Sequence, residues 1–261
     1  ILSQSYIKPD GNQGMVYPSG SPFRTQLDKL NDSNSRPLMF CNDLDISMDG
    51  KRIYFSEPFA YEGAAMGGGT VGEAITLGKN GLLWCLNLEE NTMDCVGQGY
   101  TFVDGVLLEY GAGNRESSVL ITETVKFRIL RLNLSGEKAG RDQIVQKDLP
   151  GMPDGLDRDS KGRIWIGMLK KRSSLINWLH ANPWMKPLLL RLPQSLLHSG
   201  KQTGIIAFSG DCAKPLYYST HDGNSINDIS VVVSGRDGIY FPVFDKKARG
   251  LHRMKNPLDQ E

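Results

Sequence analysis

The feature that most constrains the fold is a hairpin pattern that recurs along the chain. In its clearest copy, residues 149–168 (LPGMPDGLDRDSKGRIWIGM), a polar residue heads a short strand, a Gly-containing turn follows, and a β-branched and aromatic strand returns. Further copies lie at residues 42–55, 104–122 and 228–241. Because a lone hairpin cannot bury both of its faces, copies repeating at roughly 40–60 residues predict the four-stranded blades of an all-β propeller.

The length and charge of the chain bound this prediction. The 261 residues suffice for one core, so we expect a single β-propeller domain over residues 1–261. A six-bladed ring would need roughly 300 residues at this repeat length. Since the chain begins at Ile1 without Met, we interpret it as a six-bladed β-propeller that lacks its N-terminal part. A net charge of +1 with dispersed basic residues argues against a nucleic-acid partner.

The cysteines leave two alternatives open. The four residues (Cys41, Cys85, Cys95 and Cys212) include no CxxC pair, which disfavours a thiolate zinc site. Cys85 and Cys95 flank the turn at residues 89–92 symmetrically and can face each other across a hairpin. They are either two half-buried thiols in one blade or a disulfide, so the cellular compartment stays open.

One stretch, residues 173–197, breaks the strand pattern. Its leucines, Trp178 and Trp184 recur at helical spacing, and three prolines divide it into short helices. Such a helical insertion must lie on a face of the propeller, as a satellite core, as a lid over a pocket, or as a peripheral membrane contact. Because it follows Met168, which ends the strand returning from the Asp154 bend, we expect it at the rim where Asp154 lies.

Polar side chains head the inner strands of the predicted blades. Asn42, Asp104 and Asp154 occupy the same point of the repeat, and Asp228 heads a fourth copy. Inner strands begin at the central channel, so we expect these oxygen-rich side chains to converge there. Carboxylates and a carboxamide without histidine suit Ca²⁺, or Mg²⁺ and Mn²⁺, better than zinc. The alternative is that each residue merely caps a turn, as Asx residues often do.

The histidines and the absence of a serine-hydrolase motif further limit the possible chemistry. Among the four histidines, His221 lies in a loop (STHDG, 219–223) before the last inner strand and is the one with a claim to the axial site. No Gly-x-Ser-x-Gly elbow occurs, which disfavours serine-hydrolase chemistry.

Several stretches taken together also carry a family resemblance. They are NDLDISMDGKRIYFSE (42–57), FVDGV (102–106), LITETVKFRILRLNLSGEKAG (120–140), LPGMPDGL (149–156), GRIWIGM (162–168), NPWMKPLLLRL (182–192) and STHDG (219–223). The chain resembles the strictosidine synthase-like family, most closely the branch that contains adipocyte plasma membrane-associated protein. The resemblance runs from about Asn42 to Met254.

The resemblance implies a six-bladed propeller related to paraoxonases and gluconolactonases, with calcium in the channel at the positions of Asn42, Asp104 and Asp154. Three departures stand out. Asp104 replaces an asparagine that most of the family has, and Gly155 follows Asp154 where the family has Pro-Asp-Asn. Asp228 falls near the glutamate that serves strictosidine synthase as acid and base, and its side chain is one methylene shorter.

We therefore carry three functional hypotheses from the sequence. The first is a calcium-dependent hydrolase of lactones or aryl esters, with metal held by Asn42, Asp104 and Asp154 and with Asp228 or His221 as the base. The second is a condensing enzyme of the strictosidine synthase type that uses Asp228 without a metal. The third is a non-enzymatic propeller with a structural ion.

Overall fold

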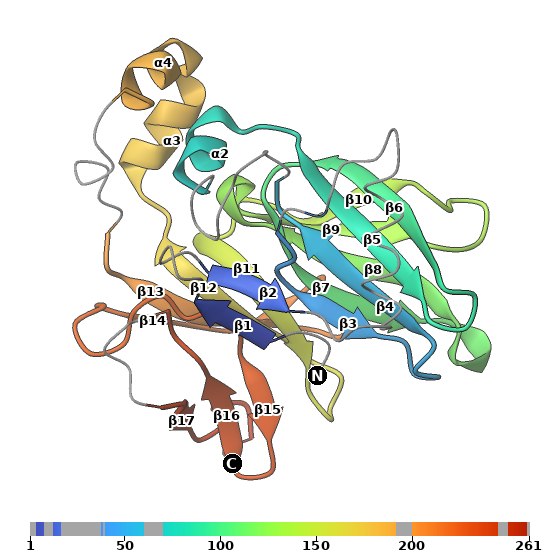
Figure 1. Cartoon of the computed structure of the whole chain (residues 1–261). Coiled ribbons are helices and arrows are strands. Elements are labelled where there is room, and N and C mark those ends of the chain that lie inside the picture. The colour runs from blue at the N-terminus through green and yellow to red at the C-terminus, as the bar shows by residue number, and fades with distance from the viewer. Residues whose placement is uncertain are drawn as a thin grey trace.

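Antiparallel sheets follow one another along the chain in the computed structural model, which describes residues 4–7, 13–16, 38, 40–59, 70–191, 200–244 and 250–259. Three sheets have four strands each and a fourth has three, while the strands β1 (Gln4–Ile7) and β2 (Gln13–Val16) form a separate hairpin (Figure 1). Within each of the four larger sheets, consecutive strands are neighbours, which is the up-and-down order of a propeller blade.

The strand bounds follow the repeat of the sequence. The first blade holds β3 (Leu44–Ile46), β4 (Arg52–Glu57), β5 (Gly81–Asn87) and β6 (Thr92–Tyr100). The second holds β7 (Val103–Tyr110), β8 (Glu116–Glu123), β9 (Arg128–Asn133) and β10 (Asp142–Gln146). The third holds β11 (Gly151–Arg158), β12 (Ile164–Lys171), β13 (Thr203–Phe208) and β14 (Pro215–His221). The fourth holds β15 (Val233–Gly235), β16 (Gly238–Phe241) and β17 (His252–Met254).

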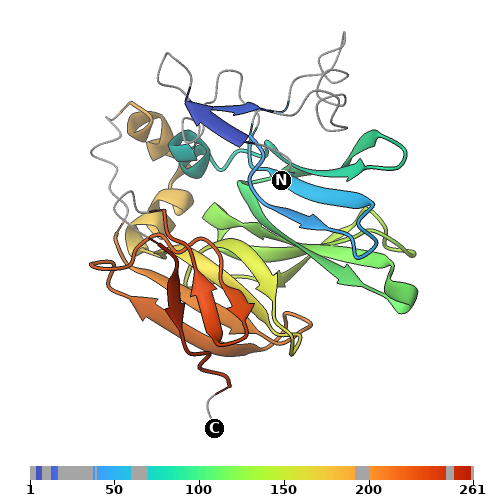
Figure 2. The ribbon, with the colours of Figure 1, turned by 60° about the horizontal axis from the view of Figure 1, so that its bottom comes forward.

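The blades are arranged around their first strands. β7 contacts β3 on one side and β11 on the other, and β11 in turn contacts β15 (Figure 2). This radial order confirms the predicted all-β propeller. The described residues contain four blades, however, and not the six that were predicted. Long connections separate β4 from β5 in the first blade and β12 from β13 in the third.

Apolar side chains fill the space between neighbouring blades. Val106 and Leu83 belong to the cluster between the first and second blades, and Phe127 and Ile166 to the cluster between the second and third. Trp165 is fully buried between the third and fourth. Neighbouring blades therefore bury apolar faces against each other, as the hairpin repeat requires.

Backbone N–H groups of one inner strand also donate hydrogen bonds to aspartate side chains of the preceding blade. Asp43 Oδ2 accepts from the backbone N–H of Val106 at 2.9 Å, and Asp45 Oδ2 accepts from that of Leu108 at 2.7 Å. Asp157 accepts from the backbone of Ser234 in the same way. The shared sequence pattern of residues 42–45 (NDLD) and 154–157 (DGLD) thus sets the spacing between blades.

The helices gather at one end of the sheets. α2 (Thr70–Thr76) lies beside α3 (Ser174–Ala181), the 3₁₀ turn η3 (Pro183–Met185) and α4 (Lys186–Leu189) (Figure 1). The Ser173 hydroxyl caps α3 by accepting from the backbone N–H of Ile176 at 3.2 Å. Lys186 Nζ donates to the carbonyl of Thr76 at 2.8 Å, which ties α4 to α2. The predicted insertion at 173–197 is helical as far as the structure describes it, and residues 192–199 lie outside the described residues.

The insertion leaves the rim at which β11 begins. Gly151, the first residue of β11, pairs with Lys171, the last residue of β12, and the backbone N–H of Arg172 donates to the carbonyl of Pro150 at 2.9 Å. Throughout the described ranges no helix has the length and apolar character needed to cross a membrane.

The cysteines of the first blade, Cys85 and Cys95, are not joined by a disulfide. Cys85 is buried and Cys95 is exposed, and the hairpin register places Asp94 opposite Cys85 and Trp84 opposite Cys95. Of the two alternatives left by the sequence, the structure therefore contains two thiols in one blade and not the disulfide.

Candidate functional site

Polar side chains from three blades meet where the inner strands begin. Asn42 precedes β3, Asp104 is the second residue of β7, and Asp154 lies in β11. The Asn42 side-chain amide donates to Asp104 Oδ1, and the Asp104 and Asp154 carboxyl groups hydrogen-bond each other. The structure thus brings together three residues that are far apart in sequence and share one position of the repeat.

The second and third inner strands approach each other closely at this point. A Cβ atom added to Gly105 would lie 2.4 Å from the carbonyl oxygen of Asp154, so any side chain at residue 105 would push the strands apart. The Thr122 hydroxyl bridges them, since it accepts from the backbone N–H of Gly105 at 2.7 Å and donates to that carbonyl at 2.9 Å. The glycine after Asp104 is therefore what allows the two carboxyl groups to touch.

Burial dominates the electrostatics of this pair. Asp104 is 4% exposed and Asp154 is 3% exposed. Burial raises the pKa of both carboxyl groups, and the adjacent Asp154 raises the pKa of Asp104 further. Hydrogen bonds from Asp104 and Ser230 act in the opposite direction on the pKa of Asp154. Burial and mutual repulsion therefore favour a metal-free pair in which a shared proton offsets one of the two charges.

A third carboxylate, Asp43, lies close to the pair and was not predicted from the sequence. Burial, followed by the repulsion of Asp154 and Asp45, raises the pKa of the half-buried Asp43 to about 7 against the lowering effect of its backbone hydrogen bonds. The signal that could have found it is the alternation of Asp43 and Asp45, which points both side chains at the next inner strand.

The fourth predicted residue, Asp228, lies beside Asp154 without joining the pair. Its negative charge contributes to the raised pKa of Asp154, and its own backbone is left-handed, with φ at 50°. Lys170, near the end of β12, forms an ion pair with Asp228 at 2.7 Å. Two residues further on, the carbonyl of Ser230 accepts from the backbone N–H of Gly155 at 3.1 Å. Sequence reasoning missed Lys170, whose cluster LKKR (169–172) marks only the end of a strand.

His221 occupies a different position. It is the last residue of β14, the outermost strand of the third blade. Its ring accepts from the backbone N–H of Gly223 at 3.1 Å and lies 3.2 Å from the Ser225 hydroxyl, so its contacts lie within its own loop. The geometry thus leaves Asp228 as the candidate base that adjoins the buried pair.

The axial side chains offer the type of ligand atom, oxygen, that a hard cation prefers. Within the described ranges no group of three or more His, Cys, Asp and Glu side chains is arranged as metal ligands. Two buried carboxyl groups, a carboxamide and the Thr124 hydroxyl, 3.3 Å from Asp104 Oδ2, are nevertheless all oxygen donors. Divalent cations such as Ca²⁺ prefer such donors, and the charge of a cation would remove the need for a shared proton.

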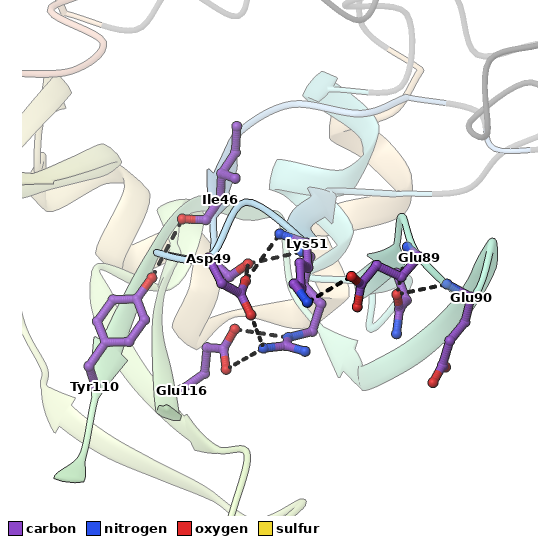
Figure 3. Close-up of polar contacts among 10 residues, drawn as sticks. Ile46, Asp49, Lys51, Glu89, Glu90, Tyr110 and Glu116 are labelled. Carbon is purple, nitrogen blue, oxygen red and sulfur yellow. Dashed lines mark hydrogen bonds and ion pairs between the residues drawn. The ribbon is translucent and has the colours of Figure 1, made fainter. Parts of the chain in front are cut away.

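A surface hollow of about 900 Å³ lies at the opposite ends of β3 and β7. Met48, Asp49, Arg52 and Glu116 are among its lining residues. The Arg52 guanidinium already binds Glu116 at 2.9 Å and Asp49 at 3.2 Å, which ties the first blade to the second (Figure 3). Because these charges satisfy one another, the buried pair at the other rim is the better candidate site.

Comparisons with known proteins bear on this site. No family model matches the sequence. A strictosidine synthase-like protein of Arabidopsis thaliana, STRICTOSIDINE SYNTHASE-LIKE 10, is 31% identical over 172 residues. The chain resembles strictosidine synthase-like proteins. The match covers 65% of this chain and 44% of that relative, and adipocyte plasma membrane-associated protein of Danio rerio is 32% identical over 60% of this chain and 37% of its own length.

The strictosidine synthase-like resemblance predicted from the motifs is thereby confirmed, and the chain spans less than half the length of these curated relatives. Among solved structures, the chain is similar to a putative gluconolactonase, with a TM-score of 0.49 and 15% identity. The match covers 93% of this chain and 64% of that one. The chain is also similar to the calcium-binding protein regucalcin from Agrobacterium tumefaciens, with a TM-score of 0.48 and 10% identity over 80% of this chain and 55% of that one.

Proposed function

We propose that this protein is a calcium-dependent hydrolase of lactones or aryl esters whose site lies at the axial end of the inner strands. The observation that carries the proposal is the contact between the buried side chains of Asp104 and Asp154, with Asn42 hydrogen-bonded to Asp104. Burying two touching carboxyl groups is unfavourable unless a proton or a cation neutralises them. A site that keeps this arrangement is suited to binding a cation.

Asn42, Asp104 and Asp154 would hold the metal, with Ca²⁺ favoured over Mg²⁺ because irregular oxygen donors suit its flexible coordination. When bound, such an ion polarises a carbonyl group and stabilises negative charge on its oxygen. Asp43, close enough to raise the pKa of Asp104, adds negative charge beside the site. Three aspartates at one axis therefore favour a divalent over a monovalent cation.

Asp228 is the proposed general base. Its carboxylate lies near Asp154 and forms an ion pair with Lys170, which fixes its orientation outside the buried pair. It would accept a proton from the water that attacks the ester or lactone carbonyl. His221, the last residue of β14, is the second candidate for this role and would have to leave its contacts with Gly223 and Ser225 to reach the axis.

A second function is a condensing reaction of the strictosidine synthase type, for which Asp228 would act as acid and base without a metal. The Lys170–Asp228 ion pair favours this alternative, because it makes Asp228 independent of the buried pair. A third is a non-enzymatic propeller in which the ion only stabilises the axis. Fold does not decide among them.

The deciding experiment combines calcium titration calorimetry with hydrolysis assays on an aliphatic lactone and an aryl acetate, with and without EGTA. We expect calcium-dependent hydrolysis, an Asp228→Asn variant that binds calcium but loses roughly a hundredfold or more in kcat, and an Asp104→Asn variant with weakened calcium binding. Asp211→Asn, in an exposed turn, is the matched control. Hydrolysis that EGTA leaves unchanged, or binding without hydrolysis of either substrate, would overturn the proposal.

A further inference from the structure

An apolar stripe faces solvent along the helical insertion. Trp178, Trp184 and Leu188 are exposed by 46%, 70% and 54%, and Ala181 between them is exposed as well. These residues lie on three consecutive helical pieces, α3, η3 and α4, and the non-helical backbone of Asn182 separates α3 from the other two. Leu190 extends the exposed apolar surface toward the end of α4.

The opposite side of the same segment is already used for packing. Ile176 packs on the core between the second and third blades, and the His180 ring lies 6.3 Å from that of Phe127. Lys186, on this side, reaches the end of α2. The segment is therefore apolar on its solvent side as well as on its protein side. A surface helix of a globular protein normally presents polar residues to water, so this outer stripe calls for a partner.

The surrounding charge indicates which partner. Residues 160–210 contain no Asp or Glu, although the chain as a whole has 29. The same stretch holds eight basic residues, namely Lys161, Arg163, Lys170, Lys171, Arg172, Lys186, Arg191 and Lys201. Some are neutralised by acids of other segments, as Lys170 is by Asp228 and Arg172 by Asp148. Lys171 and Arg191, at the two ends of the insertion, are exposed.

We propose that α3, η3 and α4 form a peripheral docking surface for an anionic lipid bilayer. Exposed tryptophans with basic residues on either side are the combination that binds the interface of such a membrane, since the indole rings enter the headgroup region and the cations attract acidic lipids. Figure 1 shows α3 and α4 at one corner of the molecule, beyond the ends of the sheets. The proposal rests on this surface and is independent of any catalytic activity.

Co-sedimentation of the full chain with large unilamellar vesicles tests the proposal. We expect binding to phosphatidylcholine vesicles that contain phosphatidylserine, weaker binding to phosphatidylcholine alone, and weakening by added NaCl. The Trp178→Ala/Trp184→Ala variant should lower the partition coefficient at least about tenfold, and Lys171→Glu/Arg191→Glu should remove the preference for phosphatidylserine. Tyr218→Ala, on the outer strand β14, and Lys214→Glu, just before that strand, form the matched control and should bind as the wild type does.

Far-ultraviolet circular dichroism and thermal midpoints should match the wild type for every variant, so that lost binding reports the surface and not unfolding. A wild-type protein that binds neither vesicle, or that binds both equally, would overturn the proposal. So would unchanged binding by the double tryptophan variant. If light scattering instead shows a dimer that this variant dissociates, the stripe is an interface between two copies of the chain and the lipid proposal is wrong.

Discussion

Lys170 Nζ lies 2.7 Å from Asp228 Oδ1, in an ion pair that joins the second strand of the third blade to the segment leading into the fourth. Both side chains are largely buried, with exposures of 17% and 27%. Asp228 therefore stands next to the Asp104–Asp154 pair with a cation of its own, while the buried pair has none among the described residues. One end of the axis thus holds two kinds of carboxylate side by side: Asp228, which is paired with a lysine, and the Asp104–Asp154 pair, which in the described part of the chain is not.

We expect this ion pair to stabilise the contact between blades. A double-mutant cycle of Lys170→Met and Asp228→Asn, measured by urea unfolding, should give a coupling free energy of about 1 kcal/mol. The exposed pair of Lys161 and Asp259, 2.8 Å apart, is the control and should show weaker coupling. Additive single-variant effects at Lys170 and Asp228 would show that the pair contributes nothing to stability.

The asparagine variant of Asp104 should bind calcium less tightly. Removing one carboxylate from the axis lowers the attraction for a divalent cation, and we expect a loss of about tenfold or more in affinity at neutral pH. The measurement is calorimetric titration of wild type and Asp104→Asn, with Asp211→Asn as the control. Equal affinities of the wild type and Asp104→Asn would mean that Asp104 is not a ligand.

The raised pKa of Asp43 predicts that the stability of the protein depends on pH. Its pKa is raised from 3.8 to about 7, chiefly by burial, so folding favours its protonated form. The stabilising contribution is complete below about pH 3.8 and is lost as the pH rises through 7. In EGTA, the free energy of unfolding of wild type relative to Asp43→Asn should therefore fall between pH 4 and pH 7. A difference that does not change over this range would contradict the raised pKa.

Gly155 marks a position where the family's asparagine does not fit this chain. A Cβ atom there would lie 2.8 Å from Val231 Cβ, so a larger residue must move the fourth inner segment. We expect Gly155→Asn to lower the free energy of unfolding by about 1–3 kcal/mol. Gly72→Asn, where nothing lies within 4 Å of an added Cβ, is the control and should be nearly neutral. If Gly155→Asn is as stable as Gly72→Asn, the fourth segment is free to move.

Asp159 carries the opposite pH dependence. It accepts from Trp165 Nε1 at 2.9 Å and from Arg163 Nε at 2.6 Å, and these bonds outweigh burial and lower its pKa. Its contribution is therefore present above the ordinary pKa of 3.8 and is lost as the pH falls below it. Asp159→Ala should cost about 3 kcal/mol, because it leaves the indole N–H and the guanidinium without their acceptor.

Thermal unfolding at neutral pH measures that loss. Asp211→Ala is the matched control, since Asp211 holds the equivalent turn of the next hairpin but is exposed. A loss for Asp159→Ala no larger than that for Asp211→Ala would show that the buried acceptor is dispensable.

The sequence by itself determined the blades and the convergence of three site residues. Each copy of the hairpin has one apolar face to bury, so the copies stack, and a residue at the head of each inner strand must reach the axis. This repeat predicted that Asn42, Asp104 and Asp154 converge. The helical insertion was visible as well, because its period differs from that of a strand.

Only the tertiary structure decided how these groups interact. The contact of Asp104 with Asp154 depends on the close approach of β7 to β11 at Gly105, and the pairing of Lys170 with Asp228 depends on which blades are neighbours. No local pattern encodes either relationship, since both join segments separated by about fifty residues or more. Strand periodicity acts within one hairpin, whereas the distance between two blades is set by packing that involves both.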